Sequence, residues 1–173
     1  MRVGLVSDTH GLLDPKLPEV LAGVDLILHA GDVVKPSILD ALSAIAPVRA
    51  VRGNNDLVPA LAAVPAFAVL DLAGLRALVL HDLGPPARPH RQAAALVEQH
   101  RPRLVVHGHS HRPGHALVGG ILFVNPGSAG PRRFSLPRTA ATLEIQGRRI
   151  RLAFVDLAGP RAVTFGEAGS FAL

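Results

Sequence analysis

The sequence predicts a layered α/β fold in which two packed β-sheets are flanked by helices. Short apolar runs alternate with helical patterns over the first two-thirds of the chain, which is typical of parallel strands joined by right-handed crossovers. The last third instead contains strand-like runs around Gly119-Gly120 and Gln146-Gly147, and these turn signals predict antiparallel hairpins. The chain should therefore form a largely parallel sheet arrangement with an antiparallel addition.

The apolar pattern places the individual elements in order. Strands are expected at 2–7, 24–28, 48–51, 67–72, 75–80, 104–106, 116–118, 121–124, 139–145 and 150–155. Helices are expected after Asp14 and Pro15, from Pro36 and from Pro89, because proline is favoured in the first turn of a helix. The tail from Leu157 is rich in Gly and Ala, and we expect it to be partly mobile.

Length and composition fit a single domain that spans residues 1–173. The chain has 173 residues and is 49% hydrophobic, which is enough for a full core. It contains no apolar run of about 18 residues, so no membrane span is predicted. The first residues lack the pattern of a signal peptide, and cysteine is absent, which excludes disulfides and thiolate chemistry. The cytoplasm is the expected compartment.

The charge of the chain favours small anionic ligands over nucleic acid. The formal net charge is +5, and nearly all of the positive charge comes from arginine. These arginines are scattered, and the chain has no Tyr or Trp on which bases could stack. We therefore expect no stable nucleic-acid complex, while a homo-oligomer remains open.

A histidine cluster follows the apolar run 104–106. The sequence 104–111 reads Leu-Val-Val-His-Gly-His-Ser-His, so a buried strand leads directly into three imidazoles. Imidazole is the commonest side-chain ligand of transition metals. Taken alone, this tract fits a metal site and a solvated histidine-rich loop about equally well.

Four other apolar runs also end in polar side chains that can bind a metal. The residues concerned are Asp8 and His10, Asp32, Asn54, His81, and then His109 with His111 in the cluster above. Ligands of α/β sheets bind beyond the carboxyl ends of the strands, so these side chains should meet at one edge. Helix caps, turns or a core histidine would explain each one separately, but that coincidence would have to occur five times.

This set of ligands suits two metal ions better than one. Two carboxylates, one amide oxygen and four imidazoles exceed the coordination of a single transition metal. Asp32 is the natural bridge, because a carboxylate has two oxygens. Mixed nitrogen and oxygen ligands favour Mn, Fe, Zn, Ni or Co. Two such ions about 3.5–4 Å apart can clamp the oxygens of a displacement at phosphorus and lower the pKa of a bridging water, which supplies hydroxide.

The order of these motifs resembles the calcineurin-like metallophosphoesterase superfamily. The motifs are Asp8-x-His10, Gly31-Asp32, Gly53-Asn54-x-Asp56, His81 and Gly108-His109-Ser110-His111. Asn125-Pro126-Gly127-Ser128 and the short chain resemble its small YfcE-like phosphodiesterase branch. The resemblance covers residues 2–156, which leaves 157–173 as a C-terminal tail. It implies a four-layer α-β-β-α sandwich of two mixed β-sheets.

The resemblance also implies an activity and a role for each ligand. It implies a dinuclear phosphodiesterase that uses a metal-bridging hydroxide, with Mn as the first choice of metal. One metal would be held by Asp8, His10, Asp32 and His111, and the other by Asp32, Asn54, His81 and His109. The catalytic set would be Asp8, Asp32, Asn54, Asn55 and His109, acting on a small phosphodiester or nucleotide-like substrate. The alternatives are a non-catalytic scaffold, as in the retromer subunit Vps29, and a nucleotide-binding protein of the same fold.

Two positions depart from the pattern of the superfamily. Many members have His directly after the Asn ligand, where it contacts the phosphoryl group and can protonate the leaving oxygen. This chain has Asn55, which can donate a hydrogen bond but cannot transfer a proton at neutral pH. Relatives usually have Gly after the His81 ligand, whereas this chain has Asp82, which either orients His81 or is a solvated charge.

The remaining candidates are expected to lie around the metals. Ser128 and Arg133 are predicted substrate contacts, although a Pro-Gly turn and a solvated loop explain them as simply. For Arg132, as for Arg133, the alternative to phosphate binding is a solvated loop. For His29 and His107 we favour hydrogen bonding behind the ligands over ligation.

Overall fold

The structure is a computed structural model that describes residues 1–133, 135–147, 149–158 and 163–172, with side chains of 163–170 outside the description. The strands are β1 (Arg2–Val6), β2 (Leu26–His29), β3 (Val48–Ala50), β4 (Phe67–Leu72), β5 (Leu75–Leu80), β6 (Leu104–Val106), β7 (Gly114–Val118), β8 (Ile121–Asn125), β9 (Thr139–Gln146), β10 (Arg149–Asp156) and β11 (Val163–Ala172). The helices are α1 (Leu17–Val20), α2 (Pro36–Ser43) and α3 (Arg91–His100), with a 3-10 turn η1 (Pro59–Leu61).

These strands form two mixed sheets, as the sequence predicts. The first sheet has the order β11-β10-β9-β1-β2-β3, and the second has the order β4-β5-β6-β8-β7. β1, β2 and β3 are parallel, as are β5, β6 and β8, while the hairpin strands pair antiparallel. All parallel strands of a sheet therefore present their carboxyl ends on one side.

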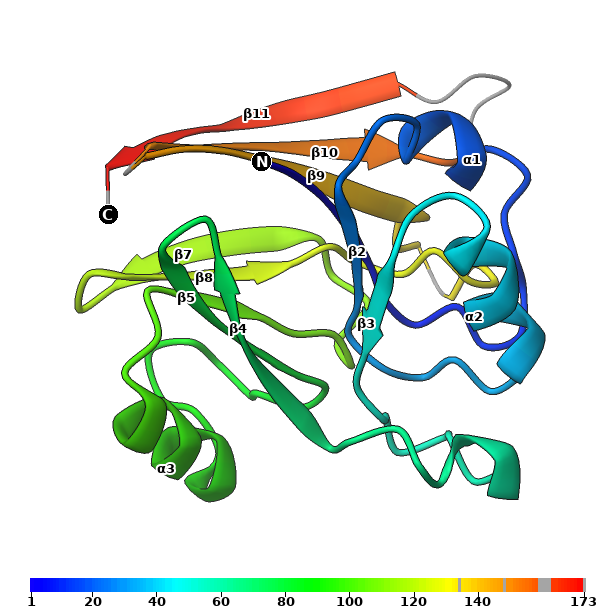
Figure 1. The fold of residues 1–173 in the computed structure, drawn as a ribbon, viewed down its shortest axis with the longest axis horizontal. Coiled ribbons are helices and arrows are strands. Elements are labelled where there is room, and N and C mark those ends of the chain that lie inside the picture. The colour runs from blue at the N-terminus through cyan, green and yellow to red at the C-terminus, as the bar shows by residue number, and fades with distance from the viewer. Residues whose placement is uncertain (134, 148, 159–162, 173) are drawn as a thin grey trace.

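Three apolar clusters join the sheets and helices into four layers (Figure 1). The first lies between the sheets and includes Leu5 and Leu28 from one sheet and Val79 and Val106 from the other. The second packs α1 and α2 on the outer face of the first sheet, and the third packs α3 on the outer face of the second. The predicted α-β-β-α sandwich is confirmed.

The central strands are continuous apolar runs because both of their faces are covered. In β1, Val3 and Leu5 face the space between the sheets, and Val6 lies among the residues that α1 and α2 cover. All three are fully buried. Such strands cannot show the alternation of a half-exposed sheet, which is why the run at 2–7 contains hardly any polar residue.

The largest difference from the sequence prediction lies in the tail. Residues expected to be partly mobile form β11, which pairs antiparallel with β10 along the edge of the first sheet. The glycines and alanines of this segment weaken the strand signal in the sequence. Pairing uses the backbone, so the edge of β10 can recruit this segment despite its composition.

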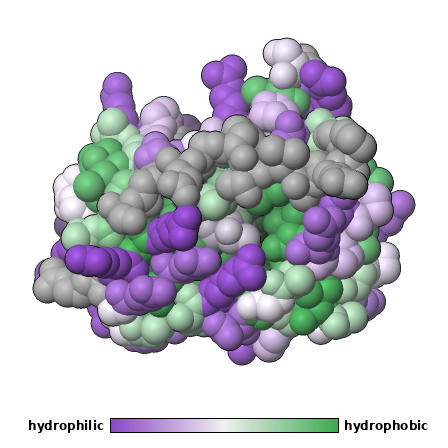
Figure 2. Space-filling model, turned by 90° about the horizontal axis from the view of Figure 1, so that it is seen from above, coloured by the Kyte–Doolittle hydropathy of each residue, from purple (hydrophilic) through white to green (hydrophobic). Residues whose placement is uncertain are grey.

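Among the residues described, no helix has both the length and the apolar composition needed to cross a membrane. Apart from the grey residues, the face seen from above spreads hydrophilic side chains among smaller apolar areas (Figure 2).

Candidate metal centre

The predicted ligands lie in the loops that follow β1, β2, β3, β5 and β6. These loops leave the carboxyl ends of the parallel strands in both sheets, so they meet at one edge of the sandwich. The structure brings all seven predicted side chains into one connected cluster: Asp8, His10, Asp32, Asn54, His81, His109 and His111. The cluster divides into two halves.

The first half contains Asp8, His10 and His111. The Asp8 Oδ1 atom is 3.2 Å from His111 Nε2, and the two Nε2 atoms of His10 and His111 are also 3.2 Å apart. One ligand atom from each of the three residues lies within 4.8 Å of the others. Asp8 and His111 are buried, so these atoms face one another away from bulk water.

The second half is arranged around the Asn54 amide oxygen. Asn54 Oδ1 is 3.1 Å from His81 Nε2 and 3.1 Å from His109 Nδ1. The two imidazoles therefore approach the same point from different loops. An amide oxygen with two imidazole nitrogens is a donor set that suits a transition metal.

Asp32 lies between the two halves. Its Oδ2 atom is 3.6 Å from His10 Nε2 and 3.5 Å from His81 Nε2, so one oxygen faces a histidine of each half. Asp8 also reaches across, because Asp8, Asp32 and His81 form a second group of ligand atoms within 4.8 Å. The two halves are thus continuous rather than separate sites.

Unsatisfied polar atoms indicate that this cluster fits a cation. The buried Asp8 Oδ1 atom has no hydrogen-bond partner among the described residues, although His111 Nε2 lies 3.2 Å away and His10 supplies the third ligand atom of the same group. A buried carboxylate oxygen without a partner is costly, and a bound cation would satisfy it. The residues present therefore fit divalent transition metals in chemistry and in arrangement.

The backbone of the site is strained at the ligands themselves. Five of the seven predicted ligands have a positive φ, with values of 54° at Asp8, 46° at His10, 58° at Asp32, 68° at His109 and 58° at His111. Residues other than glycine seldom adopt this conformation, which costs on the order of 1–3 kcal/mol each and concentrates at functional sites. The strain turns successive side chains toward one point.

Hydrogen bonds fix the orientation of the ligands. His81 Nδ1 is 2.7 Å from the Ala30 carbonyl oxygen, so this nitrogen donates and Nε2 is left for the cluster. The other oxygen of Asp8 accepts from the Ser7 hydroxyl at 2.6 Å and from the His109 backbone N–H at 3.1 Å. These contacts leave Oδ1 as the free oxygen of Asp8.

Asp56 is a supporting residue to which the sequence assigned no role. This buried carboxylate accepts backbone N–H groups from Asp32 at 3.0 Å, Gly53 at 2.8 Å and Val34 at 2.6 Å. It thereby ties the loop after β3 to the loop after β2. The only signal in the sequence was its place in the motif Gly53-Asn54-x-Asp56.

Two glycines are required because the loops pass too close for a side chain. A Cβ on Gly53 would collide with the backbone nitrogen and carboxylate of Asp32. A Cβ on Gly108 would collide with the Ser7 hydroxyl and lie 2.7 Å from Asp8 Oδ2. Both positions bring one ligand loop against another.

The electrostatics favour the metal-binding forms of Asp32 and His10, whereas in the metal-free cluster the pKa of His81 is raised, because burial is outweighed by its hydrogen bond to Asp32 and by the charge of Asp8. Burial alone would raise the pKa of Asp32, but hydrogen bonds from His81 and Asn55 outweigh it and hold this pKa well below its usual range. Burial lowers the pKa of His10, with a smaller lowering from the charge of Arg133, against the attraction of Asp32. A carboxylate and a neutral imidazole are the forms that bind metals.

His29 and His107 lie behind the ligands, as expected. Burial lowers the pKa of each to about 4, so both are neutral at pH 7. The Gly31 N–H donates to His29 Nδ1 at 3.3 Å, and His29 Nε2 is 3.1 Å from the Thr9 hydroxyl. His107 Nδ1 is 3.4 Å from Asn125 Nδ2. Neither ring belongs to the metal-ligand groups of the described residues.

Two of the expected substrate contacts, Asn55 and Ser128, form hydrogen bonds to predicted metal ligands. The Asn55 backbone N–H donates to Asp32 Oδ1 at 2.8 Å, and its side-chain amide donates to Asp32 Oδ2 at 2.6 Å. Asn55 therefore holds the Asp32 carboxylate. Ser128 is buried and donates its hydroxyl to the Asp8 carbonyl at 2.9 Å, so it supports the Asp8 backbone. Arg132 and Arg133 are exposed, and the charge of Arg133 acts on His10.

Asp82 does not orient His81, and its exposure agrees with the other role considered for it, that of a solvated charge. Its carboxylate faces His90 Nε2 at 3.5 Å and His109 Nε2 at 3.9 Å, while His81 is oriented by Ala30 instead. It is half-exposed and lies between two imidazoles, on the side of His109 away from Asn54.

Comparison with known proteins identifies the family. The calcineurin-like phosphoesterase superfamily domain matches residues 1–148. A probable metallophosphoesterase of Methanothermobacter thermautotrophicus is 29% identical over 166 residues, which cover 92% of this chain and 95% of that protein.

Two solved structures share the fold at lower identity. Vacuolar Protein Sorting 29 from Cryptosporidium parvum superposes with a TM-score of 0.82 at 20% identity, covering 99% of this chain and 98% of that one. A structure described as a novel archaeal phosphodiesterase has a TM-score of 0.73 at 21% identity, covering 89% of this chain and 99% of that one. With the matching domain and the metal-competent cluster together, this chain belongs to the calcineurin-like phosphoesterase superfamily.

Proposed function

We propose that this protein is a phosphodiesterase that depends on two divalent transition-metal ions, with Mn as the first choice. The observation that carries the proposal is the convergence of seven metal-competent side chains in one connected cluster, in which the buried Asp8 Oδ1 atom has no hydrogen-bond partner among the described residues. The fold shared with an archaeal phosphodiesterase supports the choice of a diester.

The chain's own residues would divide the work between two metal positions. Asp8, His10, Asp32 and His111 would hold one ion, and Asp32, Asn54, His81 and His109 would hold the other. When bound, the ions would supply Lewis acidity and a water of lowered pKa. Asp32 lies between the halves, with an oxygen near a histidine of each, and Asn55 fixes its orientation through two hydrogen bonds.

The residue at position 55 argues for diesters with acidic leaving groups. Departure of an alkoxide requires a proton or a metal, and a positioned general acid typically contributes about 10²–10⁴-fold. Asn55 cannot supply that proton, whereas an aryloxide leaves without it. A diester also carries one negative charge rather than two, which reduces repulsion beside Asp8 and Asp32. Arg133, whose charge reaches His10, would bind a non-bridging phosphoryl oxygen.

The test compares an aryl diester with the matching aryl monoester in the presence of Mn. The wild type should show the higher kcat/KM on the diester. Asn55→His should raise monoester activity relative to diester activity, because it adds a proton donor. Asn55→Ala is the matched control, since it also removes the hydrogen bond that the Asn55 side-chain amide donates to Asp32 but adds no imidazole ring. Preference of the wild type for the monoester, or equal ratios in the two variants, would contradict this substrate assignment.

A non-catalytic scaffold is the second candidate, because the Cryptosporidium Vacuolar Protein Sorting 29 structure has the same fold along nearly the whole chain. A scaffold is free to lose its ligands, whereas all seven positions here keep metal-competent side chains. Binding of Mn without hydrolysis of any mono- or diester would favour the scaffold.

A further inference from the structure

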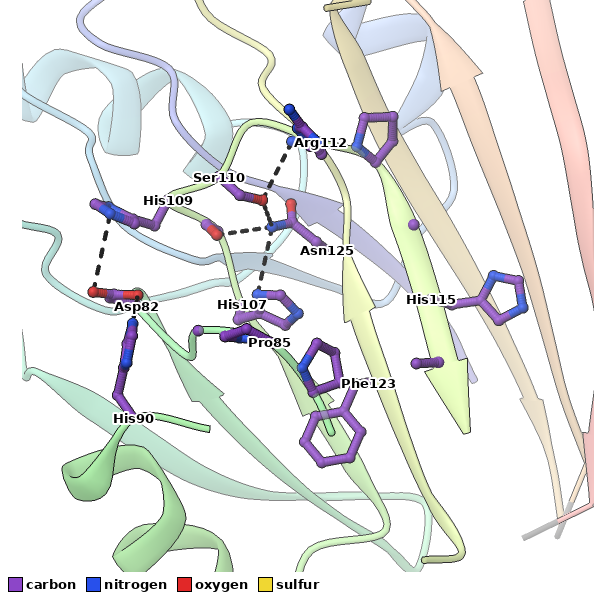
Figure 3. Close-up of a pocket in the computed structure, with 16 residues that line it drawn as sticks. Asp82, Pro85, His90, His107, His109, Ser110, Arg112, His115, Phe123 and Asn125 are labelled. Atoms are coloured by element: carbon purple, nitrogen blue, oxygen red, sulfur yellow. Dashed lines mark hydrogen bonds and ion pairs between the residues drawn. The ribbon is translucent and has the colours of Figure 1, made fainter. Parts of the chain in front are cut away.

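A pocket with a volume of about 600 Å³ lies on the outer face of the second sheet, next to the candidate metal centre (Figure 3). The loop after β5 forms one wall through Pro85 and Pro86, and β7 with Pro113 forms another. Phe123 and His107 line it from β8 and from the end of β6. This volume lies within the range of about 300–1,000 Å³ that is usual for small-molecule sites.

His109 connects this pocket to the metal centre. One edge of its imidazole places Nδ1 at 3.1 Å from Asn54 Oδ1 in the metal cluster. The other edge places Nε2 at 3.9 Å from the Asp82 carboxylate, and both residues line the pocket (Figure 3). His109 therefore lies on the border between the metal cluster and the pocket.

The lining selects for an apolar and planar group. Three prolines, Ala116 and the Phe123 ring supply flat apolar walls. Asp82 is the one carboxylate among the lining residues, and it already faces His90 and His109. The Asn125 amide is also engaged, because it donates to the Gly108 carbonyl at 2.7 Å and to Ser110 Oγ at 3.0 Å, and accepts from the Gly127 N–H at 2.9 Å. The apolar walls would hold a planar group by shape, and the lining adds polar side chains from His107, Arg112 and His115.

We propose that this pocket binds an aryl ring carried by one ester group of the phosphodiester substrate, an inference that rests on the proposed function. The ring would pack against Pro85 and Phe123 while the phosphoryl group lies at the metal centre. Specificity would then come from residues that contact no metal.

Two independent substitutions fill the pocket without altering a predicted ligand. Ala116 lies opposite Phe123 in the register of β7 and β8, so Ala116→Phe places a ring in the space. Gly114 also lines the pocket, and a Cβ there would meet nothing within 4 Å, so Gly114→Leu should fold. Leu117→Phe is the matched control, because Leu117 is the next residue of β7, is exposed and lies outside the pocket lining.

The first measurement is binding to metal-free protein, which requires no catalysis. The chain has no Trp or Tyr, so the fluorescence anisotropy of methyl 2-naphthyl phosphate can be read without a protein background. We expect saturable binding that excess dimethyl phosphate does not displace, with at least a tenfold weaker Kd in Ala116→Phe and Gly114→Leu. The Leu117→Phe protein should bind like the wild type. Equal affinity in all four proteins, or no binding to the wild type, would overturn the proposal.

The second measurement separates this proposal from the proposed function. Methyl and phenyl p-nitrophenyl phosphates share one leaving group, so their KM values with Mn-loaded protein report on the second ester group. A KM raised by pocket filling for the phenyl diester alone assigns the pocket to the retained group, and a KM raised for both assigns it to the leaving group. Unchanged KM values in both filled variants would overturn the pocket, even in an active phosphodiesterase. Naphthyl binding without any turnover would instead contradict the proposed function.

Discussion

Glycine has a different role at each end of the β-sandwich. At the carboxyl ends of the parallel strands, long loops cross one another, and Gly53 and Gly108 leave no room for a Cβ. At the other end, the hairpin turns of β4-β5, β7-β8 and β9-β10 contain Gly74, Gly119 and Gly147, where a Cβ would meet nothing within 4 Å. Glycine supplies a close approach at the first end and only a positive φ at the second.

The comparison shows that backbone strain is concentrated in the loops that carry the predicted ligands. Five predicted ligands adopt a positive φ in the crossed loops, while the turn end satisfies its tight turns chiefly with glycine. Strained residues persist only where the surroundings over-determine them. The carboxylates and imidazoles behind the ligands provide those surroundings, so changes at the two ends should have very different costs.

The Asp56 carboxylate should show the largest difference. Asp56→Ala leaves one buried and two partly buried backbone N–H groups without their acceptor, and we expect it to lower the free energy of unfolding by roughly 4 kcal/mol. Asp71→Ala is the matched control, because Asp71 is exposed and accepts one N–H, from Gly74, in the turn between β4 and β5. Its cost should stay below about 1 kcal/mol. Urea unfolding of metal-free protein measures both, and equal costs would remove Asp56 from its supporting role.

The glycine comparison should give the next largest effect. Gly108→Ala forces a Cβ against Ser7 and Asp8, and overpacking of this kind costs about 1–3 kcal/mol. It should also displace Asp8 and weaken metal binding. Gly119→Ala adds a Cβ in open space at a φ of 57°, so it should cost on the order of 1 kcal/mol and leave metal affinity intact. Isothermal titration with Mn beside urea unfolding tests both, and unchanged Mn affinity in Gly108→Ala would contradict the crowding argument.

The buried His29 ring predicts a pH dependence of stability in the metal-free protein. Above pH 6.5, neither the folded nor the unfolded chain holds a proton on this ring. As pH falls from 6.5 toward 4, His29 binds a proton in the unfolded chain but not in the folded chain, because burial lowers the pKa of His29 to about 4. The free energy of unfolding should fall by up to about 3 kcal/mol from this group and level off below pH 4.

The His29→Gln variant should flatten that dependence, measured as the urea midpoint between pH 4 and pH 7. His115→Gln is the control, because His115 is exposed. An identical pH profile in wild type and His29→Gln would show that the folded protein does not keep the His29 ring neutral.

Much of this contrast could be predicted from the sequence, for a physical reason. Buried parallel strands are continuous apolar runs, so their ends are visible as the first polar residues, and Asp8, Asp32 and His81 all occupy such ends. Strands that meet at one edge then place these residues together. The two packed sheets with helices outside followed from the same alternation of runs and helical patterns, and the four layers from the resemblance to the superfamily.

The features that could not be predicted depend on contacts with the backbone and on the direction in which a side chain points. β11 pairs through its backbone, so its Gly-rich composition hid it. Asp56 acts through three backbone N–H groups from distant loops, and Ser128 turns its hydroxyl toward the Asp8 carbonyl rather than outward. Asp82 faces His90 and His109, which no spacing in the sequence indicates. Such contacts become visible only when loops from both sheets are placed side by side.

The measurement that tests the central claim most directly is the number of metal ions per chain in wild type and in Asp32→Asn. Mn titrated into metal-free wild type should reach about two ions per chain, raise the melting temperature and restore aryl diester hydrolysis. Asp32→Asn removes charge from the group between the two halves, so it should lose the two-ion stoichiometry and nearly all activity together. Full wild-type activity at one ion per chain or fewer, or near-wild-type turnover by Asp32→Asn, would contradict the dinuclear account.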